Sequence, residues 1–141
     1  PRLIQIDAET HPVCRAAADP GEATQIAAHE MDGLLVRLRA LSDKPRVIIS
    51  HDTPQEVAEQ VAVHVHRLAQ GSGAVAEPPA LSTSRTRAFL SAVLAIIKPE
   101  LWIFGHWHTA WQGQEGSTVF RGMGFQESFV LPLPWNPIST A

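Results

Sequence analysis

The chain has 141 residues, a length that predicts a single domain over residues 1–141. It is 45% hydrophobic and 18% charged, which excludes wholesale disorder. A formal net charge of −3 and the lack of a basic run argue against an extended nucleic-acid surface. No apolar stretch approaches the roughly 20 residues that span a bilayer, so we expect no membrane partner.

The single cysteine, Cys14, forms neither an intrachain disulfide nor a cysteine-based zinc cluster. We therefore expect a reducing, cytoplasmic setting. The chain opens at Pro1 with an apolar run and no initiator Met. Removal of Met ahead of Pro1 and a start inside a larger protein both explain this opening.

The first predicted helix begins with capping chemistry at residues 19–22, where Asp19 precedes Pro20. Apolar residues then recur at helical spacing and predict one buried stripe: Met31, Leu34, Leu35, Leu38 and Leu41. We expect this helix to end near residues 43–44, because Pro45 disfavours helical geometry in the residue before it.

A short β-branched run at residues 46–50 predicts a strand covered on both faces, as in a parallel sheet between helix layers. The capping box Thr53-Pro54-Gln55-Glu56 follows and opens a second helix. Its apolar positions at helical spacing are Val57, Val61, Val65 and Leu68. His51 and Asp52 therefore lie between a strand's carboxyl end and a helix's amino end, where open α/β sheets bind ligands.

Residues 70–84 are rich in Gly, Pro, Ser and Thr and predict a loop. A third helix over residues 86–97 and a second covered strand over residues 101–104, with Trp102 in the core, come next. In the tail, residues 118–121 and 128–131 predict an antiparallel pair at one edge. The alternation of helices and strands predicts an α/β fold, a layered sheet with flanking helices.

The candidate metal ligands are histidines at the ends of the two covered strands. His106 and His108 are two residues apart, so in extended backbone both side chains project to one face and Trp107 to the other. His51 follows the other covered strand, and parallel strands bring all three imidazoles to one rim. Gly105 allows the backbone to turn sharply or to approach a ligand. Neutral imidazole suits Zn, Mn, Fe and Ni, so His51, His106 and His108 are the predicted metal ligands.

His64 and His66 have the same spacing but lie within a predicted helix, where two residues span about 200° around the axis. Their side chains diverge, so we interpret them as surface residues. Asp52 is a candidate metal ligand, and its more ordinary role is to accept backbone hydrogen bonds at the helix start.

Four residues near this rim have two interpretations each. Trp107 and Trp111 either line a substrate groove or are partly exposed aromatics beside a covered sheet. Arg85 and Arg87 either contact a phosphate or begin a solvated helix. No catalytic or substrate-binding residue is assigned from the sequence.

Residues 48–54 (IISHDTP) and 98–108 (KPELWIFGHWH) together resemble the carboxyl-terminal half of a calcineurin-like metallophosphoesterase. The resemblance covers the chain from about residue 30 to its end, and Gly-His-x-His is its specific motif. It implies a β-sandwich flanked by helices that binds two divalent metal ions of the Mn, Fe, Zn or Ni class. By resemblance His51 and His106 would ligate the second metal and His108 the first.

The family's first three motifs, Asp-x-His, Gly-Asp-x-x-Asp and Gly-Asn-His, do not occur in this chain. They supply the remaining ligands and the bridging carboxylate, and residues 7–11 have similar residue types at a different spacing. Three imidazoles alone would hold at most one metal ion, weakly, as in some mononuclear zinc hydrolases. We therefore interpret the chain as a partial domain.

The leading functional hypothesis is a hydrolase that cleaves a phosphomonoester or phosphodiester with a metal-activated hydroxide, present here as a fragment or incomplete form. The alternatives are a non-catalytic metal-binding or scaffold module derived from that fold, and an independent mononuclear zinc hydrolase. A missing half of the sandwich would expose apolar strands, so we expect a homodimer or association with an N-terminal segment.

Overall fold

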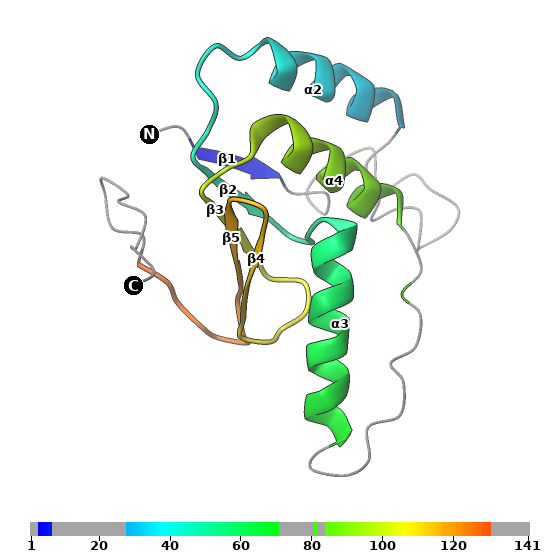
Figure 1. Ribbon diagram of the computed structural model, residues 1–141, viewed down its shortest axis with the longest axis vertical. Helices are drawn as coiled ribbons and strands as arrows, with labels where there is room; N and C mark the ends of the chain where they lie inside the picture. The colour runs from blue at the N-terminus through cyan, green and yellow to red at the C-terminus, as the bar shows by residue number, and fades with distance from the viewer. Residues whose placement is uncertain (1–2, 7–27, 71–80, 82–83, 131–141) are drawn as a thin grey trace.

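The structure, a computed structural model, describes residues 3–6, 28–70, 81 and 84–130. These residues form one five-stranded sheet in the order β1-β2-β3-β5-β4. In chain order the elements are β1 (Leu3–Ile6), α2 (Ala28–Ala40), β2 (Val47–Ser50), α3 (Gln55–Gln70), α4 (Arg85–Ile97), β3 (Leu101–Phe104), β4 (Trp111–Glu115) and β5 (Thr118–Gly122). The predicted α/β fold with flanking helices is confirmed (Figure 1).

The sheet is mixed. Strands β1, β2, β3 and β5 run parallel, and β4 pairs antiparallel with β5 at one edge. β2 and β3 are direct neighbours in register, with Ser50 opposite Phe104 at their carboxyl ends. The segments that follow these two strands therefore leave the sheet side by side.

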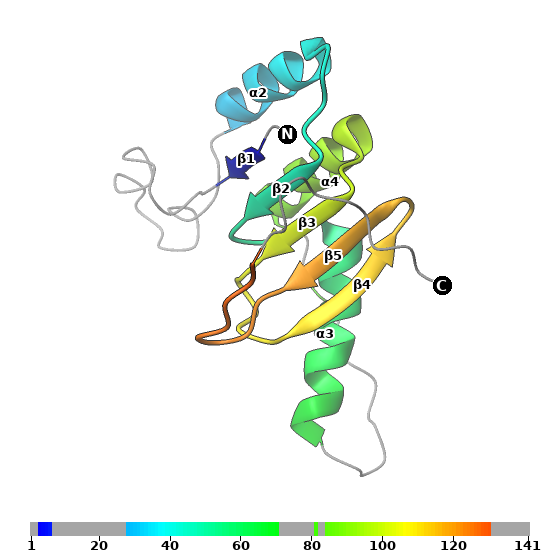
Figure 2. The ribbon, with the colours of Figure 1, turned by 90° about the vertical axis from the view of Figure 1, so that its left-hand side faces the viewer.

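The helices that the structure describes lie together on one face of the sheet, as Figure 2 shows. The strands β2 and β3 are buried on both faces, as predicted. The expectation of helix layers on both sides is wrong for the described residues, because Met123 and Phe129 of the segment after β5 pack against the opposite face.

Helix α2 buries the predicted stripe. Met31 and Leu38 are buried, and Leu34, Leu35 and Leu41 pack against the same core. The predicted start at residue 19 lies outside the described residues. The helix ends at Ala40, before the predicted end, where the Lys44 ammonium donates to the carbonyls of Leu38 and Arg39 and so satisfies the helix end.

The predicted capping box of α3 does not form. Thr53 is buried and its hydroxyl has no hydrogen-bond partner among the described residues, while the carboxylate of Glu56 accepts from the Ser91 hydroxyl of α4. The same hydroxyl accepts from the Gln55 amide, so a tertiary contact replaces the local one. Val57 and Val61 of α3 are buried, whereas Leu68 is 62% exposed because the helix runs past the sheet (Figure 1).

Helix α4 is the central helix of the described core. Its start is capped by the Ser84 hydroxyl, which accepts from the Arg87 amide, and its end by Lys98 in the left-handed conformation. Phe89, Leu90 and Val93 face the sheet and pack with Trp102 and Phe120 in one cluster. As expected Trp102 is core, and its indole N–H donates to the Ser50 hydroxyl at 2.7 Å.

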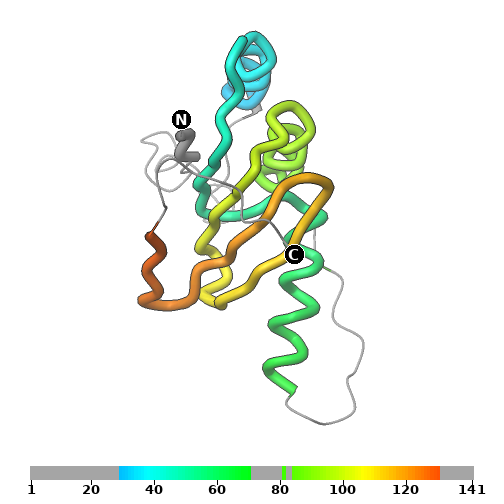
Figure 3. Tube along the Cα trace, turned by 60° about the vertical axis from the view of Figure 1, so that its left-hand side comes forward, coloured from blue at the N-terminus to red at the C-terminus, as the bar shows by residue number. Residues whose placement is uncertain are grey.

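The predicted edge pair at residues 118–121 and 128–131 is wrong in its second member. The hairpin is formed by β4 and β5 instead, residues 128–130 are not a strand, and Leu131 lies outside the described residues. β4 has no apolar run, because its middle residues are Gln112, Gly113 and Gln114. The sequence therefore did not predict it as a strand. Figure 3 shows the hairpin beside α3, where the side-chain amide of Gln60 donates to the Glu115 carboxylate.

Candidate metal centre

The two segments that carry the predicted ligands leave adjacent parallel strands. His51 directly follows β2, and His106 follows β3 after Gly105. The amides of Gly105 and His106 both donate to the carbonyl of His51, at 3.1 and 2.8 Å. These backbone bonds keep the two strand-end segments together independently of their side chains.

The imidazoles of His51 and His106 are in direct contact. His51 Nε2 lies 2.9 Å from His106 Nδ1, and the ring centroids are 4.9 Å apart at an interplanar angle of 77°. His106 is exposed and His51 half-buried. The sequence thus predicted correctly that residues 55 positions apart would meet at this rim.

The expected extended geometry of Gly105-His106-Trp107-His108 is wrong. β3 ends at Phe104, and the His108 amide donates to the Gly105 carbonyl at 3.1 Å, which closes a turn centred on His106 and Trp107. His108 then adopts a φ of 49°, the left-handed region that histidine enters more often than most residues. Strand alternation therefore does not align the side chains of His106 and His108.

His108 lies apart from the pair in this arrangement. It is exposed, and its ring centroid is 6.2 Å from that of Phe125. Across the part of the chain that the structure describes, no three or more His, Cys, Asp or Glu side chains form a group that could hold a metal ion. A ligand role for His108 stays a prediction.

The two contacting nitrogens fit one metal ion as a pair of ligands. Zinc–nitrogen bonds of about 2.0–2.1 Å at a tetrahedral angle put two ligand nitrogens about 3.3 Å apart. The observed 2.9 Å separation of His51 Nε2 and His106 Nδ1 is shorter by about 0.4 Å, so the two rings would have to move slightly apart and turn both nitrogens toward the ion. One proton holds such a pair together by a hydrogen bond, and a metal cation would take the place of that proton.

Gly105 makes no close contact that would require a glycine. A Cβ added at Gly105 would meet no atom within 4 Å, and its φ is not in the left-handed region. The expected steric need for glycine is therefore absent, and the space next to this backbone is open to a ligand.

Asp52 acts at the start of α3, as its preferred interpretation predicted. Its Oδ1 accepts from the Thr53 amide at 2.9 Å. Its Oδ2 accepts from Arg87 Nε at 2.8 Å, in an ion pair whose two side chains are only 11% and 10% exposed. The interpretation of Arg87 as part of a solvated helix start is wrong, because α4 presents this side chain to the β2–α3 segment.

Trp107 and Trp111 are both partly exposed and pack against the main core, in agreement with their interpretation as partly exposed aromatics beside a covered sheet. Trp107 has the guanidinium carbon of Arg87 5.3 Å from its ring centroid and lies edge-on to His106 at 5.8 Å. Trp111 contacts Phe104, with ring centroids 6.1 Å apart.

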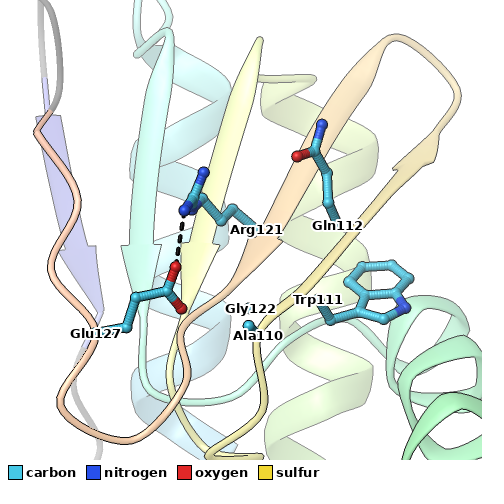
Figure 4. Close-up of a pocket in the computed structure, with 6 residues that line it drawn as sticks. All are labelled: Ala110, Trp111, Gln112, Arg121, Gly122 and Glu127. Carbon is cyan, nitrogen blue, oxygen red and sulfur yellow. Dashed lines mark hydrogen bonds and ion pairs between the residues drawn. The ribbon is translucent and has the colours of Figure 1, made fainter.

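A shallow pocket of about 250 Å³ lies over the β4–β5 edge and is lined by Ala110, Trp111, Gln112, Arg121, Gly122 and Glu127 (Figure 4). Within it Glu127 accepts from the Gly124 amide and from Arg121 Nη2, both at 2.8 Å. These donors, the Gly124 N–H most strongly, hold the pKa of the Glu127 carboxyl below its usual value.

The lowered pKa of Glu127 makes its contribution to stability depend on pH. The contribution should be complete above the unfolded-state pKa of about 4.3 and disappear as the pH falls through the lower folded-state pKa. We expect Glu127→Gln to be less stable than the wild type in urea at pH 7, with the difference shrinking at pH 3. The exposed Glu59→Gln is the control, and an equal Glu127→Gln difference at both pH values would contradict the assignment.

Comparison with known protein families and with curated proteins finds no match for this chain. Among the described helices, none combines the length and the apolar character needed to cross a membrane.

Proposed function

We propose that this protein is a metal-dependent phosphoesterase in which His51 and His106 hold a divalent metal ion. The observation that carries the proposal is the contact between His51 Nε2 and His106 Nδ1 at the ends of two adjacent parallel strands. This is the edge at which α/β sheets place their ligands. The Gly-His-x-His motif and its resemblance to the calcineurin-like metallophosphoesterases supply the reaction class.

A divalent metal, when bound, supplies Lewis acidity and a water molecule that ionises near neutral pH, the two needs of phosphate-ester hydrolysis. The role of this chain's own residues is to bind and orient. His51 and His106 each present one nitrogen to the same point.

The site is proposed to be incomplete in this chain, with one metal held weakly here and two in the complete domain. Two imidazoles fill two coordination positions and bring no negative charge to offset that of the metal. His108 is proposed as a further ligand, which requires the turn at residues 105–108 to rearrange. Asp52 does not complete the site in this arrangement: its carboxylate pairs with Arg87 and the Thr53 amide, and among the described residues it does not join the two histidines in a three-ligand group.

The second candidate function is a metal-binding or scaffold module without turnover. The observation that favours it is the lack of a third ligand beside His51 and His106 within the described residues. The same lack counts against a phosphoesterase that is active in this form.

An assay with aryl phosphomonoesters and phosphodiesters separates these functions. We expect hydrolysis that requires added Mn²⁺ or Zn²⁺, stops with a chelator, and falls to background in the His51→Ala, His106→Ala double variant. Metal binding at this pair without turnover would favour the module instead. If calorimetry detects no metal binding at millimolar Mn²⁺ or Zn²⁺, the phosphoesterase and the metal-binding module are both excluded, and the result favours a scaffold module without metal.

A further inference from the structure

We propose that Arg87 is the positioning residue of the His51–His106 pair, because its one guanidinium holds both of the segments that carry the histidines. The expected effect of Arg87 on Zn²⁺ affinity rests on the proposed function. Its expected effect on the contact between the two imidazoles rests only on the positions of the side chains. Arg87 belongs to α4, which contributes no predicted ligand and is separated from both histidines in the sequence.

The first contact of Arg87 is to the segment after β2. Its Nε donates to Asp52 Oδ2 at 2.8 Å, and Asp52 is the residue directly after His51. The pair is almost completely shielded from solvent, so it is screened much less than a surface ion pair. Asp52 is fixed in turn by the Thr53 amide at the start of α3.

The second contact is to the segment after β3. The Arg87 guanidinium carbon lies 5.3 Å from the ring centroid of Trp107, the residue directly after His106. The indole N–H of Trp107 is buried and has no partner among the described residues. Packing against the core and ring contacts hold this indole, and the cation–π contact with Arg87 is one of these contacts.

Arg87 is itself held rigidly. It is 9% exposed, its amide donates to the Ser84 hydroxyl at the helix start, and its carbonyl accepts from Ser91. A planar guanidinium can donate in its plane to a carboxylate and stack its face on an indole at the same time. A lysine ammonium has no such plane, so it can keep the charge but not both contacts in this geometry.

Losing Arg87 should loosen the imidazoles without separating the two segments. The backbone bonds from Gly105 and His106 to the His51 carbonyl do not involve Arg87 and remain. The orientation of each ring depends on the residue that follows it, and Arg87 holds both of those residues. Partners that orient metal ligands in this way typically change metal affinity about 10–100-fold when they are replaced.

The test compares Arg87→Met, Arg87→Lys and the control Arg39→Met, the same change at an exposed position of α2. For each folded protein, ¹⁵N-edited NMR of the metal-free imidazoles reports the His51–His106 contact, and calorimetry reports Zn²⁺ affinity. We expect Arg87→Met to alter the His51 and His106 nitrogen resonances and to weaken Zn²⁺ binding about 10–100-fold. Arg87→Lys should fall between Arg87→Met and the wild type, and Arg39→Met should match the wild type.

Wild-type imidazole resonances in folded Arg87→Met would overturn the inference, even if the variant melts at a lower temperature. If the wild type itself binds no Zn²⁺, the proposed function fails and the metal-free spectra alone decide the inference. If Arg87→Met does not fold, Trp107→Leu removes the ring contact and Asp52→Ala removes the carboxylate that accepts from Arg87. At least one of them should alter the same resonances, and no change in either would overturn the inference.

Discussion

Replacing Phe120 by alanine should lower the free energy of unfolding by about 3–5 kcal/mol, the usual cost of removing a large buried aromatic side chain. Phe120 is 0% exposed and lies in β5, between β3 and β4. Its ring stacks on Trp102 with centroids 5.6 Å apart, and both belong to the cluster that joins the sheet to α4. Total stabilities of about 5–15 kcal/mol leave little margin for such a loss.

Urea denaturation followed by tryptophan fluorescence measures this change, since Trp102 reports on the same cluster. Phe125→Ala is the matched control, because Phe125 is 76% exposed and its removal should change stability by no more than about 0.5 kcal/mol. Equal effects of the two substitutions would contradict the core as described.

Replacing His106 by alanine should weaken Zn²⁺ binding by more than about 100-fold. Replacing a residue that only orients a metal ligand already lowers metal affinity about 10–100-fold. His106 itself supplies one of the two nitrogens that meet at the proposed centre. His51→Ala should have the same effect, because one remaining imidazole cannot chelate. Calorimetric titration of each folded variant with Zn²⁺ measures the loss.

His64→Ala and His66→Ala are the matched controls for this loss. Both histidines lie on α3 at the spacing of His106 and His108, but a helix turns their side chains apart. Neither control should change the affinity. A weakened affinity in the His64→Ala variant together with normal binding in the His106→Ala variant would place the metal on α3 instead.

The parts of the fold that could be predicted from the sequence are those with a strong local signal. The apolar run before His51, the stripe from Met31 to Leu41 and the helix after Ser84 all form elements where their patterns indicated. β4 could not be found, because glutamines and a glycine interrupt its apolar character. The capping box at Thr53 failed because Ser91, 38 positions further on, competes for its partners.

The candidate site, like the fold, could be predicted only in part from the sequence. The meeting of His51 and His106 follows from strand adjacency, which the two apolar runs predict. The turn after Gly105 could not be predicted from a spacing argument that assumes extended backbone. Arg87 was missed as a partner of Asp52 because only the tertiary packing of α4 brings these residues together.

Anomalous diffraction at the zinc edge from a crystal soaked in Zn²⁺ shows directly whether His51 and His106 hold one metal ion. We expect one anomalous peak about 2.0–2.1 Å from both His51 Nε2 and His106 Nδ1. A peak bound to other residues, or no peak although this rim is free of lattice contacts, would contradict the proposed metal centre.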